Sequence, residues 1–306
     1  LVTNYGPLLT MWFDGSDNIK KAQGFPVMLR LRELQPDILI NNRLYSDGAP
    51  GGREHTLQKT VGDYSTPEQF IGAFERERLW ESCITIGTQW SWKPDDQLKS
   101  LKECLQTLLH TVGGDGNLLL NIGPMADGRI EPRQVERLKE MGEWLDKYGR
   151  GVYGTRGGPF KPGQWGSSTC KGDRIYLFVM NWPGNGALAL PPLPVKVRSS
   201  TLLSGGELKL DQSDEGISIT VPREARRDIA TVIEITVDGK AFDIPPVDVK
   251  MAGAGFKPAV AQVTLDRSRV SAGDALQATY TFRSSGPAPL DQTVFVHVVR
   301  PDGRHI

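Results

Sequence analysis

Short apolar runs that end in polar residues recur along the first half of the chain, and they constrain the fold more than any other feature. Leu8–Phe13 is followed by an Asp-Gly pair, and Asp37–Arg43 passes from a β-branched core into Asn-Asn-Arg. Trp80–Gly87 and Asn117–Gly123 repeat this arrangement. Each run is too short for a helix and is bounded by turn-forming residues, so each is predicted to be a buried strand.

The stretches between these runs predict helices. The apolar residues from Leu98 to Val112 fall on one stripe with the roughly 3.6-residue period of a helix. A second helix is predicted to begin with Pro132 in its first turn and to end at Gly149, in the left-handed conformation that favours glycine. Strands that alternate with helices are typical of parallel β-α units.

The texture of the chain changes after about Arg156. Glycine and proline become frequent, helical stripes disappear, and short alternating runs predict the antiparallel strands of a sandwich at Arg174–Met180, Gly216–Val221 and Thr231–Val237. A linker rich in proline, alanine and glycine then leads to a third piece. Its alternating runs are Ala261–Leu265, Ala275–Phe282 and Thr293–Val299.

Composition excludes several classes of function. Of the 306 residues, 36 are Lys or Arg and 36 are Asp or Glu, so the basic excess that nucleic-acid binding uses is missing. No stretch approaches the roughly 18 consecutive apolar residues of a membrane span. Four scattered histidines and three distant cysteines favour neither a metal centre nor a disulfide framework. We therefore expect no metal, no cofactor, no nucleic-acid partner and no membrane span.

Two carboxylates are candidates for acid, base or nucleophile. Asp14 stands where the first strand ends, which is where parallel β-α barrels carry catalytic groups. The alternative is an Asp-Gly turn that only ends the strand. Glu68 lies on the loop between the second and third predicted strands. Its alternative is structural, because Ser65–Glu68 fits a capping box for a helix beginning Phe-Ile-Gly-Ala-Phe.

Aromatic and cationic residues follow the other strand ends. Trp90 and Trp92 lie just beyond the third strand, where an indole could stack on a sugar ring or simply join the core. Arg43 could orient a carboxylate or a substrate hydroxyl, or form an ordinary surface ion pair. Gly113–Gly116 has no Gly-Lys-Ser/Thr after it, so a phosphate-binding loop is not expected.

Four motifs in order carry a family resemblance: Trp12–Gly15, Ile40–Arg43, Trp80–Gly87 with Trp90–Trp92, and Asn117–Gly128. Together they resemble the α-L-fucosidases of glycoside hydrolase family 29, from Leu1 to about Gly239. The resemblance implies an α/β fold, the C-terminal part of a (β/α)8 TIM-like barrel followed by an antiparallel β-sandwich and a truncated β module. The implied boundaries are a partial catalytic barrel at 1–156, the sandwich at 157–244, a linker at 245–256 and the third domain at 257–306.

The resemblance also implies the activity, a retaining exo-glycosidase that removes terminal α-L-fucose from oligosaccharides or glycoconjugates. It places the nucleophile on Asp14 and the acid/base on Glu68, with Glu81 as the weaker acid/base candidate. Arg43, Trp90, Trp12 and Trp92 are the implied substrate-binding residues. The alternatives are a non-catalytic carbohydrate-binding protein on a degenerate barrel, and another exo-glycosidase such as an α-galactosidase.

Location and completeness are further expectations. The resemblance and the trailing β modules favour a secreted, periplasmic or lysosome-like protein. The sequence begins at Leu1 without an initiator Met and stops just after a Pro-Asp-Gly-Arg turn, so we expect a fragment that lacks the first half of the barrel. As an isolated segment it is expected to be inactive, because an open parallel sheet exposes an edge and an uncovered face.

Overall fold

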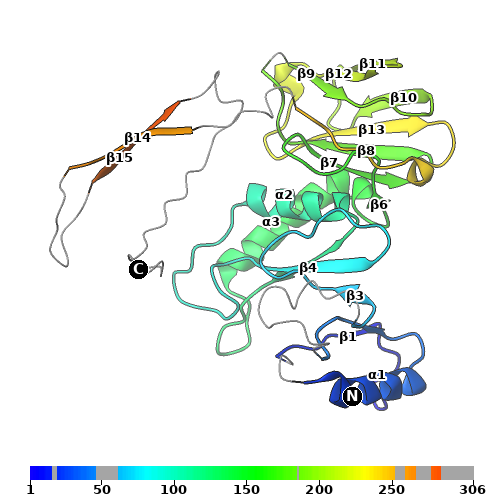
Figure 1. Ribbon diagram of the computed structural model, residues 1–306, viewed down its shortest axis with the longest axis vertical. Coiled ribbons are helices and arrows are strands. Elements are labelled where there is room, and N and C mark those ends of the chain that lie inside the picture. The colour runs from blue at the N-terminus through cyan, green and yellow to red at the C-terminus, as the bar shows by residue number, and fades with distance from the viewer. Residues whose placement is uncertain (16–18, 46–60, 185, 252–258, 267–276, 284–306) are drawn as a thin grey trace. The chain divides into compact units, whose positions relative to one another are not determined.

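The computed structural model describes residues 1–15, 19–45, 61–184, 186–251, 259–266 and 277–283 (Figure 1). Contacts divide the chain into two compact units, the first comprising Leu1–Trp182 with Gly186–Val249. The second comprises Pro183–Asn185 with Lys250–Ile306. The domain boundaries expected at residues 156, 244 and 256 remain predictions. Among the described residues, no helix is both long and apolar enough to cross a membrane.

In the described part of the chain, five parallel strands organise the N-terminal part of the first unit. Strand β1 (Thr10–Met11) pairs with β2 (Leu39–Ile40), and β4 (Leu79–Thr85) lies between β3 (Tyr64–Ser65) and β5 (Asn117–Asn121). A parallel bridge between Asn41 and Tyr64 links β2 to β3. The four predicted strands are confirmed, whereas β3 was missed because its short polar sequence has no apolar run. All five strands run in one direction, so their carboxyl ends share one edge.

Among the residues that the structure describes, three α-helices accompany these strands. They are α1 (Lys21–Leu34), α2 (Leu101–Gly113) and α3 (Pro132–Tyr148), and the last two confirm the predicted helices. Helix α2 begins with a capping box in which Ser100 and Glu103 each bind the other's backbone N–H. These two groups satisfy donors that the first turn would otherwise leave free.

The predicted left-handed end of α3 is wrong. Gly149 is right-handed, with a φ of −61°, and the chain continues into the 3-10 turn η2 (Gly149–Gly151). A glycine is still needed there for space, because a Cβ at this position would lie 2.8 Å from the ring of Tyr153. The glycine therefore reflects a close side-chain approach and not a backbone conformation.

No helix follows Glu68. The segment Gln69–Arg78 runs without regular structure before β4, and Gln69 has a φ of +59°. Arg76 fixes part of this segment by donating to the carbonyls of Gly157 at 2.5 Å and Phe242 at 3.1 Å. Its guanidinium also stacks on the ring of Phe242, 4.5 Å from the centroid. Tertiary contacts of the arginine hold the segment in place of helical hydrogen bonds, so the helix-cap interpretation of Glu68 is wrong.

The C-terminal part of the first unit consists of two antiparallel sheets. The five-stranded sheet has the order β10-β13-β8-β7-β6 and the three-stranded sheet the order β11-β12-β9. Short 3-10 turns η3 (Arg223–Ala225) and η4 (Ala241–Asp243) flank β13. The strand bounds are β6 (Arg156–Gly157), β7 (Gly166–Lys171), β8 (Arg174–Val179), β9 (Ala187–Leu190), β10 (Val197–Leu202), β11 (Lys209–Ser213), β12 (Gly216–Thr220) and β13 (Thr231–Val237).

The predicted C-terminal strands have mixed outcomes. Strands β8, β12 and β13 confirm the three predicted antiparallel strands. In the second unit, β14 (Ala259–Leu265) and β15 (Ala278–Arg283) form an antiparallel pair where two of the predicted runs lie. The third predicted run, Thr293–Val299, lies outside the described residues.

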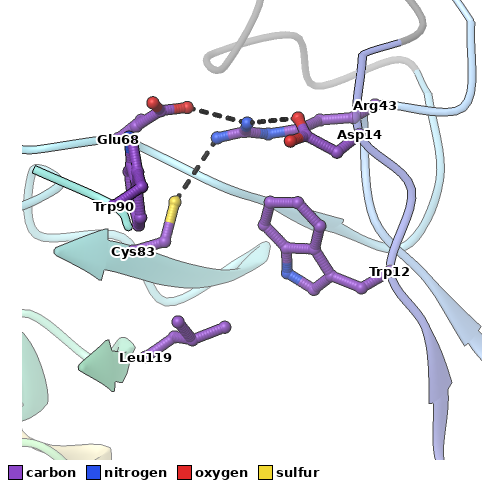
Figure 2. Close-up of a pocket in the computed structure, with 7 residues that line it drawn as sticks. All are labelled: Trp12, Asp14, Arg43, Glu68, Cys83, Trp90 and Leu119. Carbon is purple, nitrogen blue, oxygen red and sulfur yellow. Dashed lines mark hydrogen bonds and ion pairs between the residues drawn. The ribbon is translucent and has the colours of Figure 1, made fainter. Parts of the chain in front are cut away.

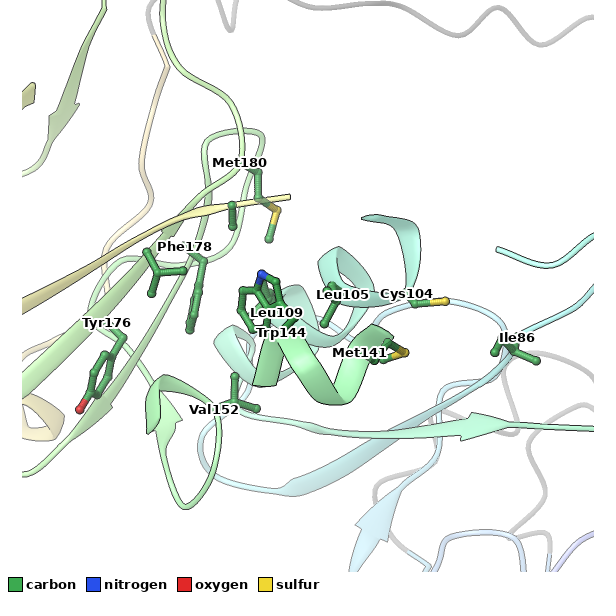
Figure 3. Packing of buried hydrophobic residues seen from close by; sticks show 12 residues of the cluster. Ile86, Cys104, Leu105, Leu109, Met141, Trp144, Val152, Tyr176, Phe178 and Met180 are labelled. Atoms are coloured by element: carbon green, nitrogen blue, oxygen red, sulfur yellow. The ribbon is translucent and has the colours of Figure 1, made fainter. Parts of the chain in front are cut away.

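The main hydrophobic core joins helices α2 and α3 to the five-stranded sheet (Figure 3). Leu105 and Leu109 of α2 are fully buried, and they share one cluster with Trp144 of α3 and Phe178 of β8. Helix α2 also contacts β5. The helices therefore pack against both the parallel strands and the five-stranded antiparallel sheet, and the parallel strands share a core with that sheet.

The loop after β4 is held by a buried carboxylate. Asp96 accepts hydrogen bonds from the hydroxyl and the backbone N–H of Thr88, and it forms an ion pair with Lys93 at 3.2 Å. The Thr88 hydroxyl, the main cause, together with the backbone N–H and Lys93, lowers the pKa of Asp96 to about 2. Asp96 thus joins the two ends of the loop that carries Trp90.

We predict that Asp96→Asn destabilises the protein at neutral pH. The ionised carboxylate stabilises the native state, and this contribution is complete above the ordinary pKa of 3.8 and lost as the pH falls toward about 2. The wild type and the variant should therefore differ most at neutral pH and converge between about pH 4 and pH 2. Urea unfolding midpoints measured across this range check the prediction. Asp95→Asn, at the exposed neighbouring position, is the control. An equal effect there would refute the proposal that Asp96 holds the loop.

Candidate active site

A pocket of about 210 Å³ lies where the parallel strands end (Figure 2). Its walls come from the ends of β1 and β2, from the segment before β4, and from β4, β5 and the loop after β4. Residues far apart in the sequence therefore meet at one strand-end edge. The lining residues are Trp12, Asp14, Arg43, Glu68, Cys83, Trp90 and Leu119.

Arg43 stands between the two candidate carboxylates. Its side chain is only 7% exposed, and its Nη1 atom lies 3.0 Å from Asp14 Oδ1 and 2.8 Å from Glu68 Oε2. Because both oxygens contact the same nitrogen, they lie no farther apart than the sum of these distances, 5.8 Å. Figure 2 shows the two carboxylates converging on the guanidinium from opposite sides. The structure thus brings Asp14, Glu68 and Arg43 into one cluster.

The rest of the Arg43 guanidinium is held by the protein. Its Nε donates to the Thr66 hydroxyl at 2.7 Å, and its Nη2 donates to the Thr66 carbonyl at 3.0 Å and to the Cys83 sulfur at 3.4 Å. With the two carboxylates, the guanidinium meets five polar atoms, as many as its N–H groups. The ring of Trp12 lies against it, with its centroid 4.7 Å from Arg43 Cζ.

Asp14 is positioned by the strand-end backbone before it. The side chain of Asn41, which directly follows β2, accepts from the Phe13 N–H at 3.0 Å and donates to the Phe13 carbonyl at 2.8 Å. The next residue, Gly15, has a φ of +64°, so the chain does turn after Asp14. The turn and the pocket position are therefore compatible, and the Asp14 side chain is 72% exposed.

Glu68 lies on a segment that pairs with β4. Cys83 donates its backbone N–H to the Pro67 carbonyl at 2.9 Å, and the Gln69 N–H donates to the Cys83 carbonyl at 2.9 Å. This parallel bridge sets Glu68 beside Cys83 at the pocket wall. The Glu68 side chain is about one third exposed, at 33%.

The two tryptophans after β4 occupy different places. Trp90 lines the pocket and is 40% exposed, and the Asn121 amide at the end of β5 donates to its carbonyl at 2.9 Å. Trp92 is not among the pocket-lining residues, and its indole N–H donates to Glu131 at 3.1 Å. Trp90 thus offers a partly exposed indole, whereas Trp92 is engaged with the start of α3.

Glu81 lies on β4 two residues before Cys83 but does not line the pocket. Its carboxylate accepts a hydrogen bond from the indole N–H of Trp12 at 3.0 Å. Burial raises the pKa of Glu81, and the bond from Trp12 opposes this rise. Glu81 therefore supports Trp12 on the side of the indole that carries the N–H.

Some pocket residues escaped the sequence analysis. Cys83 and Leu119 line the pocket, and Thr66 and Asn41 position its charged side chains. Burial, the largest cause, raises the pKa of the Cys83 thiol to about 11, so this thiol stays protonated at neutral pH. In the described ranges, no group of three or more His, Cys, Asp or Glu side chains is arranged to hold a metal ion.

The geometry suits chemistry that uses two carboxylates. Two carboxylates face a common cation, and a partly exposed indole offers an apolar wall for a ring-shaped ligand. Two carboxyl groups on either side of one bond are the arrangement that glycoside hydrolysis requires.

The family model for alpha-L-fucosidase matches residues 1–150. The alpha-L-fucosidase of Branchiostoma floridae is 33% identical over 175 residues, which make up 53% of this chain and 38% of that relative. The plasma alpha-L-fucosidase of Homo sapiens is 28% identical over 242 residues, 73% of this chain and 50% of that relative. The chain thus spans half or less of the length of these two relatives.

Solved structures agree with the sequence comparison. The alpha-L-fucosidase isoenzyme 1 of Paenibacillus thiaminolyticus has a TM-score of 0.66 and 30% identity, covering 78% of this chain and 59% of that chain. A GH29 alpha-L-fucosidase of Bacteroides thetaiotaomicron, described as a trapped covalent intermediate with 2-fluoro-fucosyl fluoride, has a TM-score of 0.66 and 27% identity. The matched region covers 76% of this chain and 57% of the Bacteroides thetaiotaomicron chain. Residues 1–150 of this chain belong to the α-L-fucosidase family.

Proposed function

We propose that the protein carrying this chain is a retaining α-L-fucosidase and that this chain supplies both of its catalytic carboxylates. The observation that carries the proposal is the contact of Asp14 and Glu68 with one nitrogen of Arg43 in a single pocket. The hydrolysis requires two carboxyl groups in one pocket, and the match to the α-L-fucosidase family model indicates that the sugar is fucose.

In the proposed mechanism, Asp14 is the nucleophile and Glu68 the acid/base. An Asp14 oxygen attacks the anomeric carbon while Glu68 gives its proton to the departing glycosidic oxygen, and a covalent fucosyl-aspartate ester forms. Glu68 then takes a proton from water, and the resulting attack on the ester releases fucose and restores Asp14. The covalent intermediate described for the Bacteroides thetaiotaomicron enzyme supports this two-step route.

The distance between the carboxylates favours retention. Their contacting oxygens are at most 5.8 Å apart. Retaining pairs stand about 5–5.5 Å apart, whereas inverting pairs stand about 6.5–9.5 Å apart to leave room for a water molecule. Arg43 contacts both carboxylates, and because its N–H groups meet protein atoms, its proposed role is to orient the carboxylates.

Trp90 and Leu119 are the proposed apolar wall for fucose. Fucose is a 6-deoxy sugar whose methyl group has no hydrogen bond to offer, so an indole face and a leucine suit it. An α-galactosidase would need polar partners for a 6-hydroxyl at the same place. Trp12 also lines the pocket, and the face of its indole ring packs against the Arg43 guanidinium.

The finer fold assignment belongs to this proposal. The strand series β1 to β5, linked by the Asn41–Tyr64 bridge, supports the C-terminal part of a (β/α)8 barrel, followed by an antiparallel sandwich. The proposed substrates are fucosylated oligosaccharides or glycoconjugates. The plasma and tissue relatives favour a secreted or lysosome-like location.

We predict that Asp14→Gly abolishes turnover of an aryl α-L-fucoside by the full-length protein, by at least about 10³-fold, because the attacking oxygen is lost. Added azide should restore turnover by entering the space left by the side chain, giving a fucosyl azide that NMR detects. Aryl α-galactoside is the parallel substrate. Unaltered activity of the variant would remove Asp14 from the mechanism. Faster turnover of the galactoside than of the fucoside would make galactose the substrate sugar. A wild-type protein that binds the fucoside without hydrolysing it would favour the carbohydrate-binding alternative.

We predict that Glu68→Gln and Glu81→Gln separate the two acid/base candidates. Glu68→Gln should lower kcat by about 10²–10⁴-fold for a fucoside with a poor leaving group, and far less for an activated aryl fucoside that needs no proton. Glu81→Gln keeps an oxygen that can accept from Trp12 and should stay within about 3-fold of the wild type on both substrates. Steady-state kinetics on the two substrates check this, and the reverse pattern would transfer the acid/base role to Glu81.

A further inference from the structure

We propose that Thr66 is the positioning residue that sets the orientation of Arg43 and, through it, the alignment of the two carboxylates; this inference rests on the proposed function. Thr66 is fully buried and does not line the pocket, so it has no direct access to a substrate. It acts through the guanidinium, which it contacts twice.

The two contacts define a plane. The Thr66 hydroxyl accepts from Arg43 Nε at 2.7 Å, and the Thr66 carbonyl accepts from Nη2 at 3.0 Å. Since the guanidinium is planar and rigid, two acceptors from one residue fix its rotation about the side-chain axis. That rotation decides where Nη1 lies, and Nη1 is the atom that meets both Asp14 and Glu68.

A second buried side chain sets the direction of the hydroxyl. Thr66 Oγ1 donates its hydrogen to Asn42 Oδ1 at 2.9 Å, and Asn42 is fully buried. A hydroxyl has one hydrogen, so once this hydrogen is given to Asn42 the lone pairs are left to face Arg43 Nε. Asn42 thus makes Thr66 a fixed acceptor toward the guanidinium.

The chain connection adds to the effect. Glu68 is two residues after Thr66, and Cys83 binds the carbonyl of the intervening Pro67. The segment that anchors Arg43 therefore also carries the proposed acid/base. A shift of Thr66 would displace both the guanidinium and Glu68, and misplacement by about 1 Å is enough to cost roughly 10²-fold in rate.

The experiment measures kcat and KM for an aryl α-L-fucoside with the full-length protein and three variants. Thr66→Val keeps the shape of the side chain but removes the acceptor and leaves the Nε–H of Arg43 buried without a partner. Thr66→Ser restores the hydroxyl. Thr169→Val removes an equally buried hydroxyl of β7, one that binds the Gly151 carbonyl in the C-terminal sheet, and is the matched control.

We expect Thr66→Val to lower kcat by about 10- to 100-fold with KM changed less than about 3-fold, because alignment and not binding is lost. Thr66→Ser and Thr169→Val should stay within about 3-fold of the wild-type kcat. Each kcat is calculated per folded molecule, and circular dichroism with thermal unfolding measures the folded fraction. If Thr66→Val does not fold, Thr66→Ala removes the same acceptor with no excess volume and takes its place.

Three results would overturn the positioning role. One is a Thr66→Val kcat within about 3-fold of the wild type, another is an equal loss in Thr66→Ser, and the third is an equal loss in Thr169→Val. Failure of the proposed function is distinguishable from all of these, because the wild type itself would then release no fucose from the aryl fucoside.

Discussion

The buried guanidinium of Arg43 is the interaction on which the site depends. A cation that is only 7% exposed is costly unless opposite charges and polar groups surround it. Here the surroundings come from three segments: Trp12 and Asp14 after β1, Thr66 and Glu68 before β4, and Cys83 within β4. Because the partners are so distant in sequence, the charge can be satisfied only when the parallel strands are in register.

Local signals predicted the elements whose causes are local. The apolar stripe of α2, the proline that begins α3, and the apolar runs of β1, β2, β4 and β5 all lie within a few residues of the structure they specify. The capping signal at Ser65–Glu68 failed because a competing interaction is not local: Pro67 and Gln69 form backbone hydrogen bonds with Cys83, and the segment becomes extended. The prediction that α3 ends at Gly149 was correct, but the glycine is needed because the Tyr153 ring packs closely against it.

The site shows the same division. Strand ends indicated Asp14 and Arg43, and the structure brings them together with Glu68 and Trp90. The sequence could not distinguish the positions of Trp90 and Trp92, because these residues are held by Asn121 and Glu131, respectively. Those partners lie about 30 or more residues away in the chain. Nor could it find Thr66, whose role comes from burial beside a cation and leaves no pattern in the chain.

Glu81 and Glu68 show why geometry must rank above acidity when roles are assigned. Burial raises the pKa of Glu81, which is the property expected of a general acid, yet its carboxylate accepts a hydrogen bond from the indole N–H of Trp12 and is not part of the pocket lining. Glu68 faces the pocket but contacts Arg43. A protonated carboxyl has no charge to hold a guanidinium, so the proposed proton transfer by Glu68 would require this contact to loosen when a substrate enters. The bonds from Arg43 to Thr66 involve neither carboxylate, so in the proposed reaction they can hold the guanidinium while Asp14 and Glu68 change their bonding and protonation.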